Sequence, residues 1–384
     1  MKAIINATVE TISHGTISSG TVIFDGGKIT AVGKDLDIPK NCEVTDGAGK
    51  YLTPGLIDAH THIGSLEQDI PEGMTDTNEK TSPVTPQLRI IDAVTPGDSA
   101  FADAVAGGIT CVQTLPGSAN VIGGQGAIIK TYGKVVDEMI VKAPSAMKAA
   151  LGENPIRIYS GQGKYPSTRM ANAACFREAM VKAENYAAKK KEAAAKKEFF
   201  ERDLRWEALE MVLEGEIPVR IHAHRADDIA TALRLADEFG LRCSIEHCTE
   251  GHLIADYLGG KGVKAAVGPT LTGRLKLEVK NMSWETPKIL LAHGVHVCII
   301  TDHPVVPLQH LPLCAALAFK AGLSRDDAMK CITLYSAEHL GIEDRMGSLD
   351  KGKDADMVLW SGDPLDCRSE VVATIIDGKT IYSR

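Results

Sequence analysis

Histidines spaced by one residue follow two apolar segments of this 384-residue chain. His60 and His62 end one such segment, and His222 and His224 end another. Residues i and i+2 of a strand point to the same face, so each pair can offer two imidazoles to one side of a sheet. Such a pair could bind a divalent metal ion, although one pair alone is a weak signal.

Two further apolar segments end in residues of the same chemical kind. One ends in His247, and the other ends in Asp302 followed by His303. Mixed imidazole and carboxylate ligands suit zinc, manganese or iron. Because four segments with such ends are improbable by chance, we expect a single metal centre built from all of them.

A divalent ion held there would supply hydrolytic chemistry. It would lower the pKa of a bound water from 15.7 towards ~7 and polarise a carbonyl group. A neighbouring carboxylate could take the proton of the water and pass it to the leaving group. Asp302 is the candidate for this catalytic role, since it is a carboxylate among histidines and the positive charge of a metal favours its ionised form.

The middle of the chain must position these residues, and it alternates apolar strands with amphipathic helices. Near-continuous runs of Val, Ile and Leu between helices indicate a parallel sheet that is buried on both faces. Roughly eight such units over about 290 residues fit a closed β/α barrel, the eight-stranded TIM barrel. An open doubly wound sheet usually has a glycine-rich turn after its first strand, whereas here the first strand ends in His-Thr-His.

Both ends of the chain are predicted to be β-rich. Short apolar runs at residues 21–24 and 371–376 adjoin glycine-containing turns, as in hairpins. Chain termini often lie close together, so the two ends are expected to form one small sheet domain. The predicted organisation is a small β-sandwich domain from residues 1–52 and 346–384, and a barrel domain from residues 53–345.

Two segments interrupt the barrel pattern. Residues 170–214 are rich in Ala, Lys and Glu, a composition that favours helix. We expect an inserted, solvated helix pair there, with an oligomer contact or a lid as the alternative. Residues 64–96 show little periodicity and are expected to form a long loop over the barrel mouth.

Composition excludes several classes of protein. The net charge is −8, and no Lys/Arg cluster is flanked by aromatic residues, so a nucleic-acid partner is not expected. No apolar stretch approaches 18 residues, so no membrane span is expected. The nine cysteines form no C-x-x-C pair, which argues against a structural zinc knot. A cytoplasmic location follows by default, and a symmetric homo-oligomer is expected as for many soluble enzymes.

The chain resembles the amidohydrolase superfamily and contains sequence motifs similar to those of imidazolonepropionases and prolidase-like dipeptidases. The resemblance rests on residues 54–62, which open the barrel, and on residues 347–349 and 352–356, which re-enter the small domain. It implies a divalent metal cofactor, zinc, at two ions per chain. It also implies metal ligands from the first, fifth, sixth and eighth barrel strands, namely His60, His62, His222, His247 and Asp302.

Binuclear members of this superfamily carry a bridging group on the fourth strand, either a carbamylated lysine or a glutamate. We interpret Glu153 as that metal ligand, since a carboxylate supplies the negative charge that a second cation needs. Lys148 is the competing candidate, although it lies within the apolar run rather than at its end. If neither residue bridges, the site is mononuclear.

Polar residues beyond the strand ends are candidates for substrate binding. Arginine is the usual partner of a substrate carboxylate, so as a group these residues favour a small anionic substrate. Each could instead be a packing residue or a surface ion-pair member, and His303 could simply brace Asp302. The candidates are Gln125, Tyr165, Arg169, His224 and Arg225, with Arg274 as a further arginine.

The leading functional hypothesis is hydrolysis of a carbon–nitrogen amide bond in a cyclic amide, an N-acyl compound or a dipeptide-like compound. The alternative is deamination of a purine, pyrimidine or related ring, which the same barrel supports. A bridging Glu153 would argue against deamination. A non-catalytic metal-binding protein is the third hypothesis, which the full set of ligands disfavours.

Overall fold

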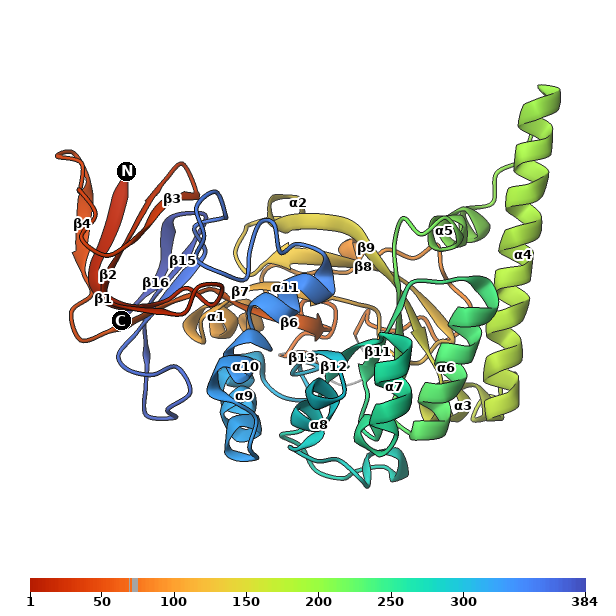
Figure 1. Ribbon diagram of the computed structural model, residues 1–384. Helices are drawn as coiled ribbons and strands as arrows, with labels where there is room; N and C mark the ends of the chain where they lie inside the picture. The colour runs from red at the N-terminus through yellow and green to blue at the C-terminus, as the bar shows by residue number, and fades with distance from the viewer. Residues whose placement is uncertain (69, 71–74) are drawn as a thin grey trace.

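The computed structural model describes residues 1–68, 70 and 75–384 (Figure 1). It contains two sheets of eight strands each. Helices and loops surround the second sheet, and a long helix projects from the side opposite the chain termini (Figure 1).

The first sheet is built from both ends of the chain. Its order is β16-β15-β14-β5-β1-β2-β3, with β4 paired to β1. The antiparallel pairing of β5 with β14, in which Pro54 faces Met357, joins the two ends. This confirms the small sheet domain, while its boundaries at 52/53 and 345/346 stay a prediction. The strands are β1 (Lys2–Glu10), β2 (Thr16–Asp25), β3 (Lys28–Gly33), β4 (Glu43–Asp46), β5 (Tyr51–Pro54), β14 (Met357–Trp360), β15 (Val371–Ile376) and β16 (Lys379–Ser383).

The second sheet is the expected eight-stranded barrel, nearly closed. Its strands follow one another in chain order from β6 to β13. The backbone N–H of His62 donates to the carbonyl of His303 at 2.9 Å, which brings the two ends of the sheet together. The strands are β6 (Leu56–Thr61), β7 (Ile109–Thr114), β8 (Ile122–Lys130), β9 (Ile140–Ala150), β10 (Val219–Ala223), β11 (Cys243–His247), β12 (Lys264–Val267) and β13 (His296–Ile299).

Strand β8 departs from the all-parallel pattern, because it runs antiparallel to both β7 and β9. Parallel neighbours need a crossover of a dozen or more residues. Only residues 115–121 separate β7 from β8, and the single turn α2 (Val136–Met139) precedes β9. The short connections therefore impose hairpins on this part of the barrel.

The remaining helices cover the barrel. Helix α6 shows why they form: Asp227 and Asp228 occupy its first turn, where carboxylates stabilise the helix dipole, and Gly240 ends it with a left-handed φ of 64°. Its buried face includes Ile229 and Leu233. The helices are α1 (Ser99–Ala106), α3 (Glu153–Ser160), α6 (Ala226–Phe239), α7 (Ala255–Lys261), α8 (Thr286–Ala292), α9 (Leu311–Lys320), α10 (Arg325–Lys330) and α11 (Leu334–Leu340), with 3-10 turns η1 (Ile90–Asp92), η2 (Gly251–Ile254), η3 (Leu277–Val279) and η4 (Leu308–His310).

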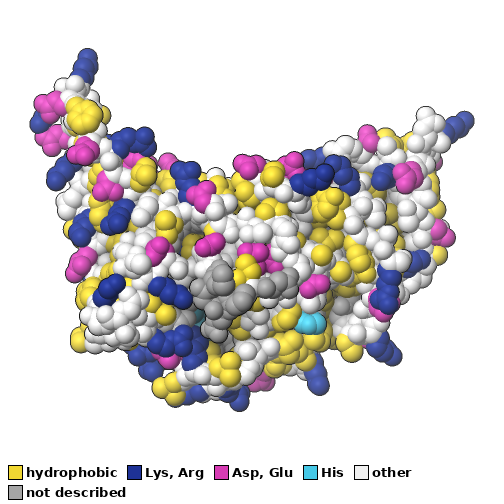
Figure 2. Space-filling model, turned by 180° about the vertical axis from the view of Figure 1, so that it is seen from behind, with side chains coloured by type: hydrophobic (Ala, Val, Ile, Leu, Met, Phe, Trp, Pro, Cys, Tyr) yellow, Lys and Arg dark blue, Asp and Glu magenta, His cyan; other side chains and the backbone are white. Residues whose placement is uncertain are grey.

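The expected helix pair lies between β9 and β10. It consists of α4 (Arg169–Lys196) and α5 (Leu204–Leu213). Side chains of α4 are buried on one face as far as Tyr186. The end of α4 stands clear of the body (Figure 1) and carries both basic and acidic side chains (Figure 2).

Part of the loop expected at residues 64–96 lies outside the described residues, namely 69 and 71–74. Its later part contains η1 and pairs with β8 through Val84 and Arg89. Among the described residues, no helix is long and apolar enough to cross a membrane.

Candidate metal centre

Six side chains meet where the barrel strands end. They form two groups of three. Within each group, the candidate ligand atoms all lie within 4.8 Å of one another. The first group comes from the end of β6 and from the segment just after β13. The second group comes from the ends of β10 and β11. The groups are His60, His62 and Asp302, and His222, His224 and His247.

The two groups adjoin one another through His247. Its ring centroid lies 4.4 Å from that of His222 and 4.9 Å from that of His60. Its Nδ1 atom lies 3.9 Å from Oδ2 of Asp302. His224, expected as a substrate contact, belongs to the second group, since its ring lies 4.6 Å from that of His222. The arrangement is therefore one patch with enough ligands for two ions.

Hydrogen bonds orient these rings. Nδ1 of His62 donates to the carbonyl of Leu115 at 2.8 Å, and Nδ1 of His247 donates to the carbonyl of Gly268 at 2.9 Å. Because a carbonyl only accepts, each Nδ1 must carry the proton, and each Nε2 keeps its lone pair. Such outer contacts select the ring nitrogen that binds a metal.

Burial keeps four of these imidazoles neutral. It lowers the pKa of His60 to about 4, with Lys148 adding to the effect, and lowers the pKa of His224 to about 3. The pKa values of His222 and His247 are also well below the ordinary value, first because of burial. Metals bind the neutral imidazole, so the rings are in the ligating form.

Asp302 lies among these rings as an ionised carboxylate. Its Oδ1 atom is 3.3 Å from Nε2 of His62 and 3.6 Å from Nε2 of His60. Burial raises the pKa of Asp302, but His247 and His62 outweigh it, so the pKa falls below the ordinary value. The carboxylate can therefore act as a ligand and as a proton acceptor.

Two observations fit a bound cation. Oδ1 of Asp302 and Nδ1 of His222 are buried and have no hydrogen-bond partner in the described part of the chain. Buried polar atoms without partners are rare, and a missing ion is one explanation. In addition, His247 and Asp302 have φ values of 71° and 54°, a strained conformation that concentrates at functional sites.

The structure brings Lys148, and not Glu153, against the two groups. Nζ of Lys148 lies 2.8 Å from Nε2 of His60, and its side chain is completely buried in β9. Glu153 belongs to neither group. Strand β9 ends at Ala150, and the chain has turned into α3 by the time it reaches Glu153.

An acidic residue outside the predicted ligand set contacts one of the ligands. Oε2 of Glu246 accepts a hydrogen bond from Nδ1 of His60 at 2.7 Å, and the carboxylate also accepts one from Ser244. Burial raises the pKa of Glu246, but hydrogen bonds to its carboxylate, including the one from His60, lower it to well below its usual range. Its position beside His247 in β11 was the available signal.

Three polar residues outside the barrel strands lie beside the second group. Oε1 of Glu278 lies 3.9 Å from Nε2 of His222 and 4.0 Å from Nε2 of His224. Nζ of Lys276 donates to this Glu278 oxygen at 2.8 Å. The amide of Asn154 approaches Nε2 of His222 at 3.5 Å. Glu278 lies in η3, Lys276 directly precedes that turn, and Asn154 lies in the first turn of α3, so sequence periodicity does not place them.

The arginines proposed to bind substrate are partly neutralised. Nε of Arg169 donates to Oδ1 of Asp228 at 3.0 Å, and Nη2 of Arg225 donates to Oδ2 of Asp227 at 2.7 Å. Arg274 donates to a backbone carbonyl at 3.2 Å. Their role in substrate binding stays a prediction, as does that of Tyr165, which is 47% exposed.

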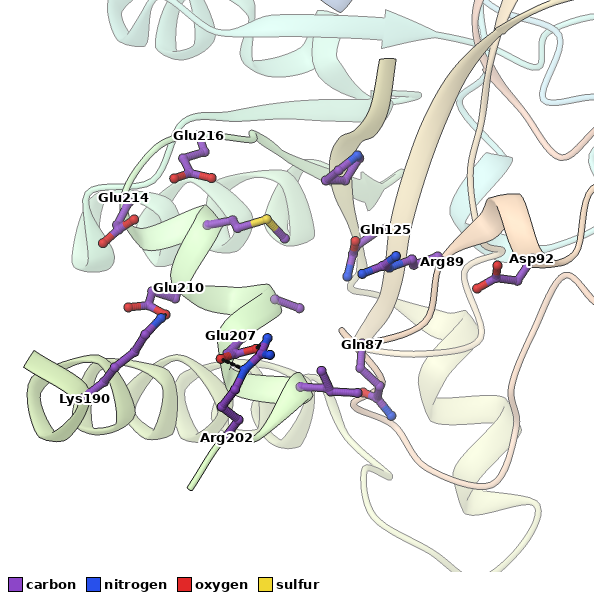
Figure 3. Close-up of a pocket in the computed structure, with 14 residues that line it drawn as sticks. Gln87, Arg89, Asp92, Gln125, Lys190, Arg202, Glu207, Glu210, Glu214 and Glu216 are labelled. Carbon is purple, nitrogen blue, oxygen red and sulfur yellow. Dashed lines mark hydrogen bonds and ion pairs between the residues drawn. The ribbon is translucent and has the colours of Figure 1, made fainter. Parts of the chain in front are cut away.

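Gln125 lies in a different cavity. This cavity has a volume of about 650 Å³ and lies between α5 and the barrel strands. Figure 3 shows Gln125 and Arg89 on its barrel side, facing Arg202 and Glu207. Among the residues that the structure describes, no histidine lines this cavity, so the structure does not bring Gln125 to the metal ligands.

His303 contacts its own loop. Its Nδ1 atom accepts a hydrogen bond from the backbone N–H of Leu308 at 3.1 Å, and its backbone N–H donates to the hydroxyl of Thr301. These contacts hold the segment that carries Asp302.

Comparison with known proteins agrees with this architecture. The model of the amidohydrolase family matches residues 51–381. The crystal structure of an amidohydrolase from Thermotoga maritima MSB8 is 44% identical, with 100% of both chains covered and a TM-score of 0.98.

Curated relatives point the same way. The amidohydrolase tasK of Hapsidospora irregularis is 30% identical over 94% of this chain, which spans only 39% of that protein. The imidazolonepropionase of Colwellia psychrerythraea is 24% identical, with 91% of this chain and 87% of that protein covered. The chain belongs to the amidohydrolase family and, as a member, is a hydrolase that acts on carbon–nitrogen bonds.

Proposed function

We propose that this protein hydrolyses the amide bond of a small cyclic amide, N-acyl compound or dipeptide-like compound with two zinc ions. The adjoining groups of three ligands are the observation that carries the proposal. His60, His62 and Asp302 would hold one ion, and His222 and His247 the other. His224 would complete the second site or face the substrate, and Lys148 would replace Glu153 as the bridging residue.

When bound, the metal would polarise the substrate carbonyl and increase the acidity of a water molecule. Asp302 would accept a proton from that water as the oxygen bonds to the carbonyl carbon. The same carboxylate would then give the proton to the leaving nitrogen as the carbon–nitrogen bond breaks. Its unpaired Oδ1 and its position among the ligands support this role.

Three basic side chains on the side of β10 could contact a substrate carboxylate, which would compete with the carboxylate partner that each of them already has. The ammonium group of Lys276 lies beside Glu278 and 3.4 Å from the amide oxygen of Asn154. Arg169 and Arg225 lie where α4 and α6 begin. The name of the imidazolonepropionase relatives indicates an imidazolone ring with a propionate group, which is a cyclic amide with a carboxylate.

Ring deamination is the second candidate, since His224 joins His222 and His247 in one group and Glu246 is buried beside His60. The two reactions release different products. Amide hydrolysis leaves a new carboxylate together with an amine, whereas deamination of a ring releases ammonia and leaves a carbonyl.

The test is a substrate panel on zinc-loaded protein. Cyclic amides, N-acyl amino acids and dipeptides would be compared with purines and pyrimidines, and products identified by mass spectrometry together with an ammonia assay. We expect turnover of an amide that is lost on chelation and in Asp302→Asn but kept in Asp344→Asn, whose side chain is exposed. Ammonia release from ring compounds alone would replace amide hydrolysis with deamination.

A further inference from the structure

A second pocket lies at the edge of the barrel opposite the metal ligands. Its volume is about 420 Å³, and residues at the beginnings of β10, β11 and β12 and the ends of α6, α7 and α11 line it. The metal ligands lie at the other ends of the same strands: Arg220 lines the pocket, and His222 follows it by two residues in β10.

The pocket is basic although the chain has a net charge of −8. Its two acidic side chains already have cationic or imidazole partners: Asp237 pairs with Lys261 at 2.5 Å, and Glu338 with His296 at 2.8 Å. Apart from Lys261, the basic side chains that line the pocket have no carboxylate within 4.0 Å among the described residues. The basic residues that line the pocket are Lys142, Arg220, Arg242, Lys261 and Lys264.

Two buried donors beside the pocket have no acceptor among the described residues. Arg220 is 2% exposed, and its Nη1 atom donates to Nε2 of His339 at 2.7 Å. Because a guanidinium group only donates, Nε2 of His339 must accept, and its Nδ1 must carry a proton. Nδ1 of His339 and Nε of Arg220 both lack partners within the part of the chain that the structure describes. Buried donors of this kind favour an acceptor with negative charge.

We propose that this pocket binds a small oxyanion, the carboxylate or phosphate group of a ligand other than the substrate. Lys142 in β9 and Arg242 just before β11 supply charge at its rim, and Arg220 supplies charge at its buried wall. The pocket is separate from the metal ligands, but a chain of hydrogen bonds connects its buried Arg220 to one of them. Arg220 donates to Ser244 at 2.9 Å, Ser244 donates to Glu246, and Glu246 accepts from His60.

Isothermal titration with sodium phosphate, and separately with sodium acetate, would test the site at constant ionic strength. The proteins are wild type, the double variant Lys142→Gln/Arg242→Gln and the control Arg205→Gln, which removes an exposed cation outside the pocket. Each would be titrated in the zinc-loaded and the metal-depleted form. Thermal unfolding midpoints would verify that the variants fold.

We expect saturable binding of one anion per chain in both forms of the wild type, weakened at least about tenfold in the double variant and unchanged in the control. The stronger of the two anions identifies the ligand group as phosphate or carboxylate. Binding that persists in the double variant but disappears with the metal would place the anion at the metal centre and overturn the proposal. Absence of saturable binding in the wild type would also overturn it.

Discussion

Nζ of Lys148 lies 2.8 Å from Nε2 of His60, and both side chains are completely buried. The other ring nitrogen of His60 faces the ionised Glu246 at 2.7 Å. His60 therefore joins a lysine on the metal side of its ring to a carboxylate on the far side. These two contacts lead to separate predictions for metal binding.

Lys148→Met is expected to reduce the zinc content of the purified protein. The lysine is the buried residue of the fourth barrel strand that contacts a ligand, and a carbamate on Nζ would provide the negative charge that two cations need. Such a carbamate forms from the neutral amine and CO₂ with release of a proton. We therefore also expect bicarbonate to increase zinc uptake by the wild type. Atomic emission on reconstituted samples measures both effects.

The control for Lys148→Met is Glu153→Gln, which changes the residue first interpreted as the bridge. We expect its zinc content to equal that of the wild type. Full zinc content in Lys148→Met, combined with a loss in Glu153→Gln, would return the bridging role to Glu153.

Glu246→Gln is expected to weaken zinc binding by about 10- to 100-fold, the usual effect of removing a group that orients a ligand. The carboxylate accepts from Nδ1 of His60 and so fixes which nitrogen of the ring faces the metal. Competition with a chromogenic chelator measures the affinity. Glu214→Gln, at an exposed position at the end of α5, is the matched control. Equal affinities in both variants would contradict the orienting role.

Much of the ligand set could be predicted because strand periodicity determines direction. Residues i and i+2 of a strand point to the same face. This rule predicted that His60 lies with His62 and that His222 lies with His224, as the structure shows. The alternation of strands and helices likewise predicted the barrel. The reversal of β8 was not predicted, since a single apolar strand has the same pattern whether it runs parallel or antiparallel.

The surroundings of the ligands were harder to predict. Glu278 reaches His222 from η3, a short turn that no periodic sequence pattern predicts. Gln125 lies inside β8 rather than beyond a strand end, and it lines a different cavity. The sequence favours Glu153 over Lys148 as the bridging residue, because Lys148 lies within the apolar run rather than at its end. The structure places Lys148, and not Glu153, beside His60, while the identity of the bridging residue stays a prediction.

Thr301→Val is expected to destabilise the fold by about 0.5–1.5 kcal/mol, the net contribution of one hydrogen bond, because Oδ2 of Asp58 keeps the backbone N–H of Thr301 as a donor. The hydroxyl of Thr301 donates to Oδ2 of Asp58 at 2.6 Å, joining the first and last strands of the barrel. Urea denaturation of the metal-depleted protein measures the change. Thr380→Val, at an exposed position of β16, should stay within about 0.5 kcal/mol of the wild type. Similar values for the two variants would show that the Thr301 contact adds little.

The buried ammonium group of Lys130 neutralises carboxylates where the barrel meets the small sheet domain. Its Nζ atom donates to Asp356 at 2.6 Å, to Asp377 at 2.9 Å and to Asp354 at 3.2 Å. Lys130→Met would leave the buried Asp356 without this partner. We expect a loss of about 3–5 kcal/mol at pH 8, as for other buried ion pairs that lose one member.

This loss is expected to shrink as the pH is lowered. Burial raises the pKa of Asp356 to about 6 even beside Lys130, so its contribution to stability is fully present below the unfolded pKa of about 4 and is lost as the pH rises through 6. Without Lys130 the folded pKa rises further, and at pH 5 the carboxyl group is protonated and needs no cation. Urea denaturation of wild type and variant gives the difference in the free energy of unfolding at pH 8 and at pH 5.

Lys28→Met is the matched control for Lys130→Met, because Lys28 pairs with the same Asp354 at 2.5 Å while its side chain is 49% exposed, against 6% for Lys130. Asp354 keeps Lys130 and Arg345 as partners in this variant, and the Lys28 ammonium returns to water at little cost, so this variant should lose only about 0–1 kcal/mol at either pH. If both lysines cost the same, or if the cost of Lys130→Met did not change with pH, burial of the charges would not be the source of the stabilisation.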